Sequence, residues 1–159
     1  STPIKSSAAS DVYKRQTQGH IVSVVDRDRQ KSDINAQPKP YAISKPVVIL
    51  IDEGTASASE ILSGALKDNQ KAILVGKRTF GKGMIQRIFP LPDSTGMNLT
   101  IAKYLTPKGI DINKKGITPD YEVSYTEKDF LKDKDPQMDE AKKIIHKLIL
   151  SKHEIAKAG

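Results

Sequence analysis

The sequence predicts a mixed α/β domain built around one parallel β-α-β unit. Two short apolar runs, PVVILI at residues 46–51 and AILVG at residues 72–76, have the length and composition of strands buried on both faces of a parallel sheet. Between them, apolar residues recur with the period of one helix face, at Ala58, Ile61, Leu62, Ala65 and Leu66. Because a strand, a helix and a strand follow one another, we expect a right-handed crossover between neighbouring parallel strands.

The other strands should form a smaller, antiparallel part of the fold. HIVSVV at residues 20–25 is rich in β-branched residues, and the polar segment 26–40 after it predicts a loop that ends in proline. MIQRIF at 84–89 and MNLTIAKY at 97–104 are separated by the turn sequence LPDSTG, which predicts a hairpin.

The C-terminal region predicts a loop followed by one long helix. Residues 106–120 carry glycines, prolines and lysines without a period, as a loop does. Asp135 is placed to cap a helix whose first residue is Pro136, and His146 falls on its solvent side. The side chains expected to face inward are Met138, Ala141, Ile144, Ile145, Leu148 and Ile149.

Length and composition indicate one domain with a tail before it and a helical extension after it. A chain of 159 residues with 37% hydrophobic content can form one modest core. Residues 1–18 have no apolar period and predict a disordered tail. The stretch SSAASDVYKRQ within this tail resembles translated adapter sequence, so we expect a non-native tail and a native protein that extends further upstream. The domain should cover residues 19–125, and the extension residues 126–159.

Composition also excludes several classes of function. The absence of cysteine removes disulfides, thiol nucleophiles and thiolate metal sites, and we expect no metal and no cofactor. The longest apolar run, VVILI, is far shorter than the roughly 20 residues of a membrane-spanning helix, which argues against membrane insertion. The net charge of +7 comes from lysines interleaved with acidic residues, a pattern that favours a solvated surface over a nucleic-acid interface.

The segment DEGTASASEILSG, residues 52–64, places three hydroxyls just before the predicted helix, at Thr55, Ser57 and Ser59. Ser57 and Glu60 match a capping box, which stabilises a helix start by about 1 kcal/mol and needs no further function. A serine on a sharp turn between a buried strand and a helix is also where hydrolases hold a nucleophile. Taken alone, this segment favours the cap.

The segment GKRTFGKGMIQ, residues 76–86, admits two kinds of chemistry. Gly76, Gly81 and Lys82 fit the start of a phosphate-binding loop, G-x-x-x-x-G-K. Gly83, however, stands where a serine or threonine should bind magnesium, and a strand rather than a helix should follow. Alternatively, a lysine in a partly desolvated site has a lowered pKa and can act as a base. A surface lysine in a flexible loop fits this segment equally well.

A serine in this chain has few groups that could activate it. The histidines nearest to Ser57 are His20 and His146, both remote in sequence. A Ser–Lys pair is therefore the serine chemistry that the chain offers.

The order and spacing of four segments resemble one enzyme family. DEGTASASEILSGAL, ILVGKRTFGKGMIQ, LTIAKYLTPKG and KGITPD together resemble the carboxyl-terminal processing proteases, tail-specific Ser/Lys peptidases of family S41 that trim periplasmic, lumenal and envelope proteins. The thylakoid and cyanobacterial branch is especially similar, and the resemblance covers about residues 19–150. It implies the α/β spiral sheet that this family shares with ClpP and crotonase.

The resemblance also implies roles for four residues. Ser57 would be the nucleophile, and Lys82, twenty-five residues later, would be the base. Gln86 would hold the lysine amine, and the backbone N–H of Ala58 would form half of an oxyanion hole. Residues 1–50 contain no Arg-Asn-Asn-Pro-Gly-Gly type segment for the other half, and no PDZ domain. We therefore expect the C-terminal part of a catalytic domain, with little activity on its own.

For the whole protein, the resemblance implies an exported endopeptidase that can form oligomers, forms an acyl-enzyme and cleaves near exposed apolar C-termini of proteins. It implies no cofactor, no nucleic-acid partner and no stable membrane insertion. Two alternatives remain. One is a noncatalytic binding module of the same fold, and the other is a phosphate- or nucleotide-binding protein.

Overall fold

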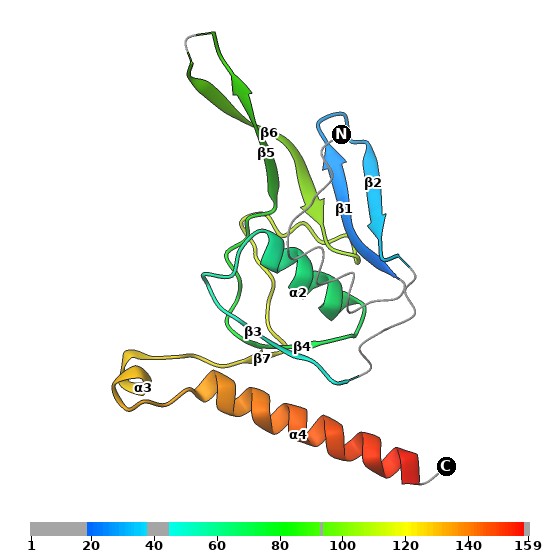
Figure 1. Cartoon of the computed structure of the whole chain (residues 1–159), viewed down its shortest axis with the longest axis vertical. Coiled ribbons are helices and arrows are strands. Elements are labelled where there is room, and N and C mark those ends of the chain that lie inside the picture. The colour runs from blue at the N-terminus through cyan, green and yellow to red at the C-terminus, as the bar shows by residue number, and fades with distance from the viewer. Residues whose placement is uncertain (1–18, 38–44, 93, 158–159) are drawn as a thin grey trace.

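A computed structural model describes residues 19–37, 45–92 and 94–157, and the predicted tail at residues 1–18 lies outside them. Two sheets stack with a helix between them, and a longer helix lies beyond the second sheet (Figure 1). The strands are β1 (His20–Asp26), β2 (Lys31–Asn35), β3 (Val48–Ile51), β4 (Ile73–Gly76), β5 (Met84–Pro90), β6 (Gly96–Leu105) and β7 (Tyr121–Glu122). The helices are α2 (Ala58–Asp68), α3 (Glu127–Leu131) and α4 (Pro136–Lys157).

The predicted β-α-β unit is confirmed. β3 and β4 pair in parallel, from Val48 opposite Ile73 to Ile51 opposite Gly76, and α2 connects them. β7 adds to the other side of β4, so the order of this sheet is β3-β4-β7. Leu74 and Val75 of β4 are fully buried, as expected for a central strand.

Burial of β3 on both faces was a wrong prediction. Leu50 is 37% exposed, and Val48 and Ile49 are only half-buried. The physical reason is position, because in the described part of the chain β3 is an edge strand that pairs only with β4. An apolar run does not tell a central strand from an edge strand.

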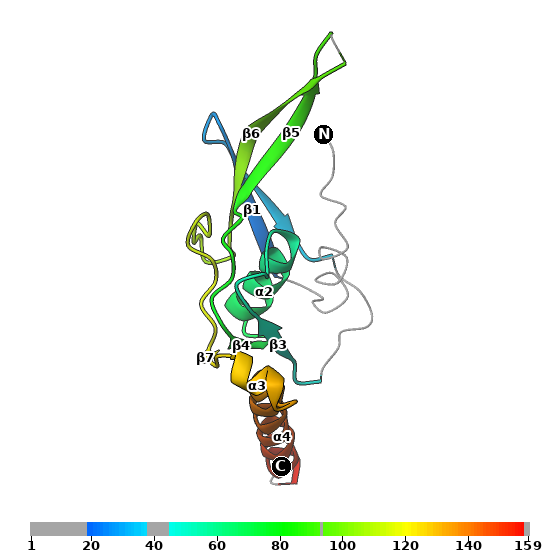
Figure 2. The same cartoon turned by 90° about the vertical axis from the view of Figure 1, so that its left-hand side faces the viewer.

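The second sheet is antiparallel, in the order β2-β1-β6-β5. The predicted hairpin is confirmed, with β5 and β6 paired from Met84 opposite Lys103 to Pro90 opposite Gly96. This hairpin projects well beyond the rest of the molecule (Figures 1 and 2). β2 was predicted as loop, and it lies at the sheet edge with one partly buried apolar side chain, Ile34, too little for an apolar pattern to reveal.

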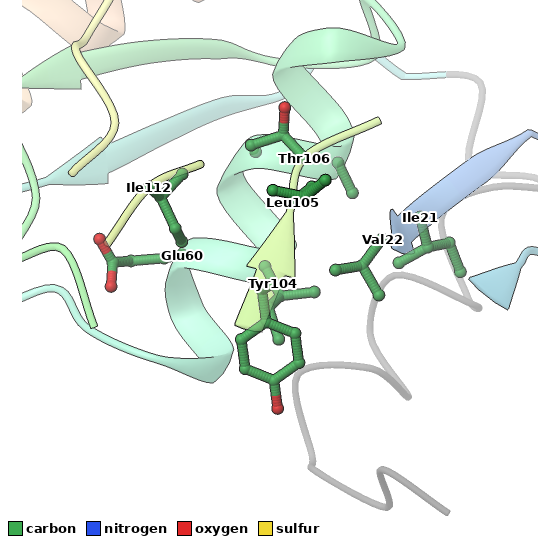
Figure 3. A pocket seen from close by; sticks show the side chains of 10 residues that line it. Ile21, Val22, Glu60, Tyr104, Leu105, Thr106 and Ile112 are labelled. Carbon is green, nitrogen blue, oxygen red and sulfur yellow. The ribbon is translucent and has the colours of Figure 1, made fainter. Parts of the chain in front are cut away.

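The core on this side lies between α2 and the antiparallel sheet. Its buried residues come from the helix face predicted above, from the two central strands and from the residue after β2, and they are Ile21, Val22, Ala36, Ile61, Ala65 and Tyr104. The space beneath the helix, lined partly by these side chains, measures about 10 Å³ and is too small to hold a substrate (Figure 3). This face of α2 therefore serves packing.

The C-terminal helix begins as predicted, since Asp135 Oδ1 accepts the N–H of Met138 at 2.9 Å. Ala141 and Ile144 are buried and α4 packs against β3 and β4. The inward stripe is only partly correct, because Met138 and Ile149 are exposed. Figure 1 shows that α4 extends well beyond the small sheet. His146 is exposed, as expected.

Two short elements escaped prediction. β7 has two residues and α3 has five, so neither is long enough to show a periodic pattern of apolar residues. Thr126 caps α3. Among the helices of the described residues, none has the length and apolar character needed to cross a membrane.

Candidate active site

The turn after β3 is held by one carboxylate. Asp52 Oδ1 accepts the N–H of Gly54 at 3.0 Å, the N–H of Thr55 at 2.9 Å and the hydroxyl of Thr55 at 2.9 Å. The carbonyl of Thr55 then accepts the N–H of Phe80 at 2.9 Å, which ties this turn to the loop after β4. The two segments singled out in the sequence are therefore neighbours in space.

Ser57 has an unusual backbone at the start of α2. Its φ of 57° and ψ of −115° lie outside the regions that residues with a side chain prefer, and such strain concentrates at functional sites. The capping box forms, with Glu60 accepting the Ser57 N–H at 2.9 Å, while the Ser57 hydroxyl approaches the Glu60 N–H without full hydrogen-bond geometry. By contrast, the Thr55 hydroxyl is bonded to Asp52 on both sides, and Ser59 is exposed.

Glu60 is the centre of the site. Its side chain is fully buried, and its two carboxylate oxygens accept four hydrogen bonds. Oε1 accepts the Thr79 hydroxyl at 2.5 Å and the Gly81 N–H at 2.7 Å. Oε2 accepts the Lys82 N–H at 2.8 Å and the Ser57 N–H at 2.9 Å. Because one oxygen binds both amides, the backbones of Ser57 and Lys82 lie side by side. We call these contacts the Glu60 network.

Figure 3 shows the direction in which the Glu60 side chain leaves α2 relative to the apolar core. Glu60 points away from Val22 and Ile21 and lies on the side of Ile112. The helix thus packs on the antiparallel sheet with one face and offers its first turn to the loops around Lys82. The positive end of the helix dipole favours a carboxylate in this turn.

The loop that carries Lys82 is packed closely against residues 112–116. Gly81 has φ +87°, and a Cβ there would lie 2.8 Å from the Gly116 nitrogen. A Cβ on Gly83 would lie 2.7 Å from the Asn113 nitrogen. Both glycines are buried, whereas the lysine between them is exposed. The backbone of Lys82 is therefore fixed although its side chain faces solvent.

Three predicted site residues are placed as follows. The ammonium of Lys82 bonds to no acceptor within the described ranges, and the partly desolvated site expected for a lysine base is not formed by these residues. Gln86 is exposed on β5, and its Oε1 accepts from Asn98 Nδ2 at 3.3 Å rather than contacting Lys82. Among the described residues, none accepts the N–H of Ala58, so this group stays available to an oxyanion.

The phosphate-loop alternative fails on structure. Lys82 is followed by strand β5 from Met84 onward, so the loop does not open a helix of its own, as a phosphate-binding loop does. Gly81 and Gly83 serve close packing with residues 112–116 instead.

Sequence analysis missed the residues that support the site. Thr79 is buried, and its hydroxyl accepts the N–H of Ile117 at 2.7 Å while donating to Glu60. Gly116 has φ +67° and packs against Thr79. The glycine in KKGITP was a usable signal for a special turn, but its partner was not visible in the sequence.

The fold is that of a class of proteases. The structure titled photosystem II D1 C-terminal processing protease is 38% identical, with a TM-score of 0.69 over 74% of this chain and 30% of that chain. A putative peptidase from Parabacteroides merdae, 16% identical, has a TM-score of 0.71 over 87% of this chain and 46% of that one, and shares the fold. The family model of peptidase family S41 matches residues 6–123, so the chain belongs to that family.

Curated relatives agree with this assignment. The carboxyl-terminal-processing protease of Synechocystis sp. is 52% identical over 100 residues, which are 63% of this chain and 23% of that protein. The chloroplastic C-terminal processing peptidase of Tetradesmus obliquus is 43% identical over 105 residues, 66% of this chain and 23% of that protein. The chain thus spans about a quarter of the length of these relatives.

Proposed function

We propose that this chain is part of the catalytic domain of a carboxyl-terminal processing serine peptidase, with Ser57 as nucleophile and Lys82 as base. The observation that carries the proposal is the shared Glu60 oxygen, which brings the backbones of Ser57 and Lys82 together at the start of α2. Family membership and the strained Ser57 backbone support it. Ser57 and Lys82 are twenty-five residues apart in the sequence. The chain between them forms α2, β4 and the loop after β4, and this loop brings the backbone of Lys82 back beside that of Ser57.

In this mechanism the Ser57 Oγ bonds to the scissile carbonyl carbon while its proton passes to the neutral amine of Lys82. The carbonyl oxygen becomes an oxyanion that accepts the Ala58 N–H. As the C–N bond breaks, Lys82 returns the proton to the leaving amine and an acyl-enzyme remains. Water then attacks the ester, with Lys82 again taking a proton and passing it to Ser57 Oγ. Gln86 would hold the lysine amine.

The exposed Lys82 side chain explains why the activity is proposed for the longer protein. A lysine is a base at neutral pH where its surroundings disfavour its charged form, most often through burial. The described residues leave this side chain in solvent. We propose that the rest of the parent covers it and supplies the second oxyanion donor, which is worth on the order of 3 kcal/mol of transition-state stabilisation in comparable sites. The 159-residue chain alone should be weakly active or inactive.

The substrates proposed are proteins with exposed, largely apolar C-termini. The names of the relatives support C-terminal processing and, for the algal protein, a chloroplast location. We extend these to the parent as an extracytoplasmic enzyme of the periplasm, envelope or thylakoid lumen. It needs no cofactor and no nucleic acid, and its subunits can oligomerise.

Three variants of the full-length parent test the proposal. Ser57→Ala and Lys82→Ala should each abolish hydrolysis of a peptide with an apolar C-terminus, and mass spectrometry should find no acyl-enzyme on either. Lys108→Ala, a change at another exposed lysine whose backbone N–H binds Asp68 at the far end of α2, is the matched control and should keep wild-type turnover. Turnover by Lys82→Ala at the wild-type rate would refute the mechanism.

The alternative is a noncatalytic binding module, which the solvent-exposed Lys82 favours. It predicts that the full-length protein binds the same peptide without hydrolysing it and that Ser57→Ala leaves the dissociation constant and the absence of turnover unchanged. The peptidase predicts turnover that depends on Ser57.

A further inference from the structure

We propose that Glu60 is a positioning residue that fixes the main chains of the nucleophile and the base relative to each other. The proposal rests on the peptidase function proposed above. Glu60 would touch neither substrate nor the reacting atoms, and it would act through Ser57 and Lys82.

The contacts of Glu60 exceed what a helix cap needs. A capping box uses the carboxylate only for the N–H of the cap residue. The chain contains a second box of that simple kind, in which Asp129 accepts from the N–H and the hydroxyl of Thr126, in its own turn and partly exposed to solvent. Glu60 instead makes three further bonds to residues that lie 19 to 22 positions away, beyond β4.

All four partners of Glu60 are hydrogen-bond donors, so the side chain at this position must carry acceptors and no donor. Three are backbone amides, and the fourth is the Thr79 hydroxyl, which already accepts the Ile117 N–H and must direct its own proton to Glu60. No lysine, arginine or histidine of the described ranges forms an ion pair with Glu60. Four donors and the helix dipole therefore stabilise this buried carboxylate, and removing them leaves it unsatisfied.

The Glu60 network has two consequences for chemistry. It occupies the N–H of Ser57 and leaves that of Ala58 unpaired, so the peptide after the nucleophile, not the one before it, faces a developing oxyanion. It also holds the Cα of Lys82 beside the turn of Ser57, so only side-chain rotations remain to align the two. Misplacement of such groups by about 1 Å can reduce a rate about 100-fold.

Glu60→Gln in the full-length parent is the direct test, because glutamine keeps the shape and replaces one oxygen with an NH₂ group. In one orientation that group faces the N–H groups of Ser57 and Lys82, and both contacts are lost. In the other it faces the Gly81 N–H, whose contact is lost, and the Thr79 hydroxyl, which must turn to accept. We expect kcat to fall about 100-fold while KM changes less than about threefold. Hydrogen exchange should accelerate in the peptides that cover residues 55–60 and 79–83.

Asn69→Ala is the matched control. Asn69 ends the same helix, and its amide donates to the carbonyls of His20 at 2.7 Å and Ala65 at 2.8 Å, far from Ser57. This variant should lose melting temperature and keep kcat. Should Glu60→Gln fail to fold, Thr79→Val removes only one of the four donors and should still lower kcat about tenfold with unchanged KM.

The outcomes separate this proposal from the peptidase assignment. A folded Glu60→Gln or Thr79→Val protein with kcat within twofold of wild type overturns the positioning role, as does a kcat loss that Asn69→Ala reproduces at equal loss of stability. If the wild-type parent hydrolyses no peptide, the proposed function fails. Exchange then decides alone: acceleration at residues 79–83 in Glu60→Gln supports the network, and unchanged exchange overturns it.

Discussion

Packing of the Lys82 loop against residues 112–116 can be tested with two glycines that share a backbone conformation. Gly116 has φ +67° and Gly109 has φ +78°, so an alanine at either position is strained. A Cβ on Gly116 would lie 2.1 Å from the carbonyl oxygen of Thr79, whereas a Cβ on Gly109 meets nothing within 4 Å. The pair therefore separates backbone strain from the clash.

Gly109→Ala should cost about 1 kcal/mol, which is the penalty for an alanine in the left-handed region. Gly116→Ala adds a clash with backbone that cannot move without displacing Thr79, and overpacking of this kind costs about 1–3 kcal/mol more. We expect a total of about 3–4 kcal/mol for Gly116→Ala. In the full-length parent it should also reduce peptide turnover, since Thr79 supports Glu60.

The assay is urea unfolding of the 159-residue chain, followed by circular dichroism at a helix wavelength and analysed by linear extrapolation. Both variants should keep the wild-type slope, so that a shift in midpoint reports stability. Equal losses for Gly116→Ala and Gly109→Ala would refute the close approach of residue 116 to Thr79, and with it our account of how the Lys82 loop is held.

Three further predictions concern the same region. Thr79→Val should lower the free energy of unfolding in urea by about 2 kcal/mol, because the Glu60 oxygen loses a donor and the Ile117 N–H loses an acceptor. Thr79→Ser keeps the hydroxyl and should cost less than half as much. Equal losses for the two variants would contradict this role of the hydroxyl. Burial raises the pKa of Asp111, but the bond from Lys103 at 2.8 Å, the Asn113 N–H and the charges of Lys103 and Lys115 outweigh it and hold the pKa below its ordinary value of 3.8. Because the pKa of Asp111 is lower in the folded protein than in the unfolded chain, the ion pair stabilises the fold at pH values above the unfolded pKa. This stabilisation is lost as the pH falls through the folded pKa. The difference in free energy of unfolding between wild type and Lys103→Met, less than about 1 kcal/mol, should therefore shrink from about pH 5 to about pH 2. An advantage that grew on acidification would contradict it. Millimolar ATP with magnesium should leave the melting temperature unchanged, because β5 follows Lys82 where a phosphate loop needs a helix, and a clear rise would reopen the nucleotide alternative.

Prediction from sequence succeeded where a local pattern was long. The predicted runs 46–51 and 72–76 contain the parallel strands β3 and β4, the apolar face of residues 58–66 is the packing face of α2, and the hairpin around LPDSTG formed. It failed where an element was short or polar. β2, β7 and α3 have five residues or fewer and little apolar periodicity, so only their partners define them.

The candidate site shows the same division. Ser57 and Glu60 are three residues apart, and their local bond could be predicted as a capping box. The same carboxylate also binds Thr79, Gly81 and Lys82, which lie 19 to 22 residues further along the chain. A local sequence pattern cannot predict hydrogen bonds between residues so far apart. The roles of Lys82 and Gln86 came from family resemblance, and these roles remain predictions.

The sequence by itself determined the β-α-β unit, the serine at the helix start, the glycine-flanked lysine and the family, because each depends on the order and spacing of residues along the chain. Only the tertiary structure decided that one buried carboxylate joins the serine and lysine segments, that residues 112–117 support the loop from behind, and that the lysine side chain remains in solvent. The physical reason is that hydrogen-bond partners and burial depend on which segments the folded sheets bring together, and that information lies in contacts distant along the chain.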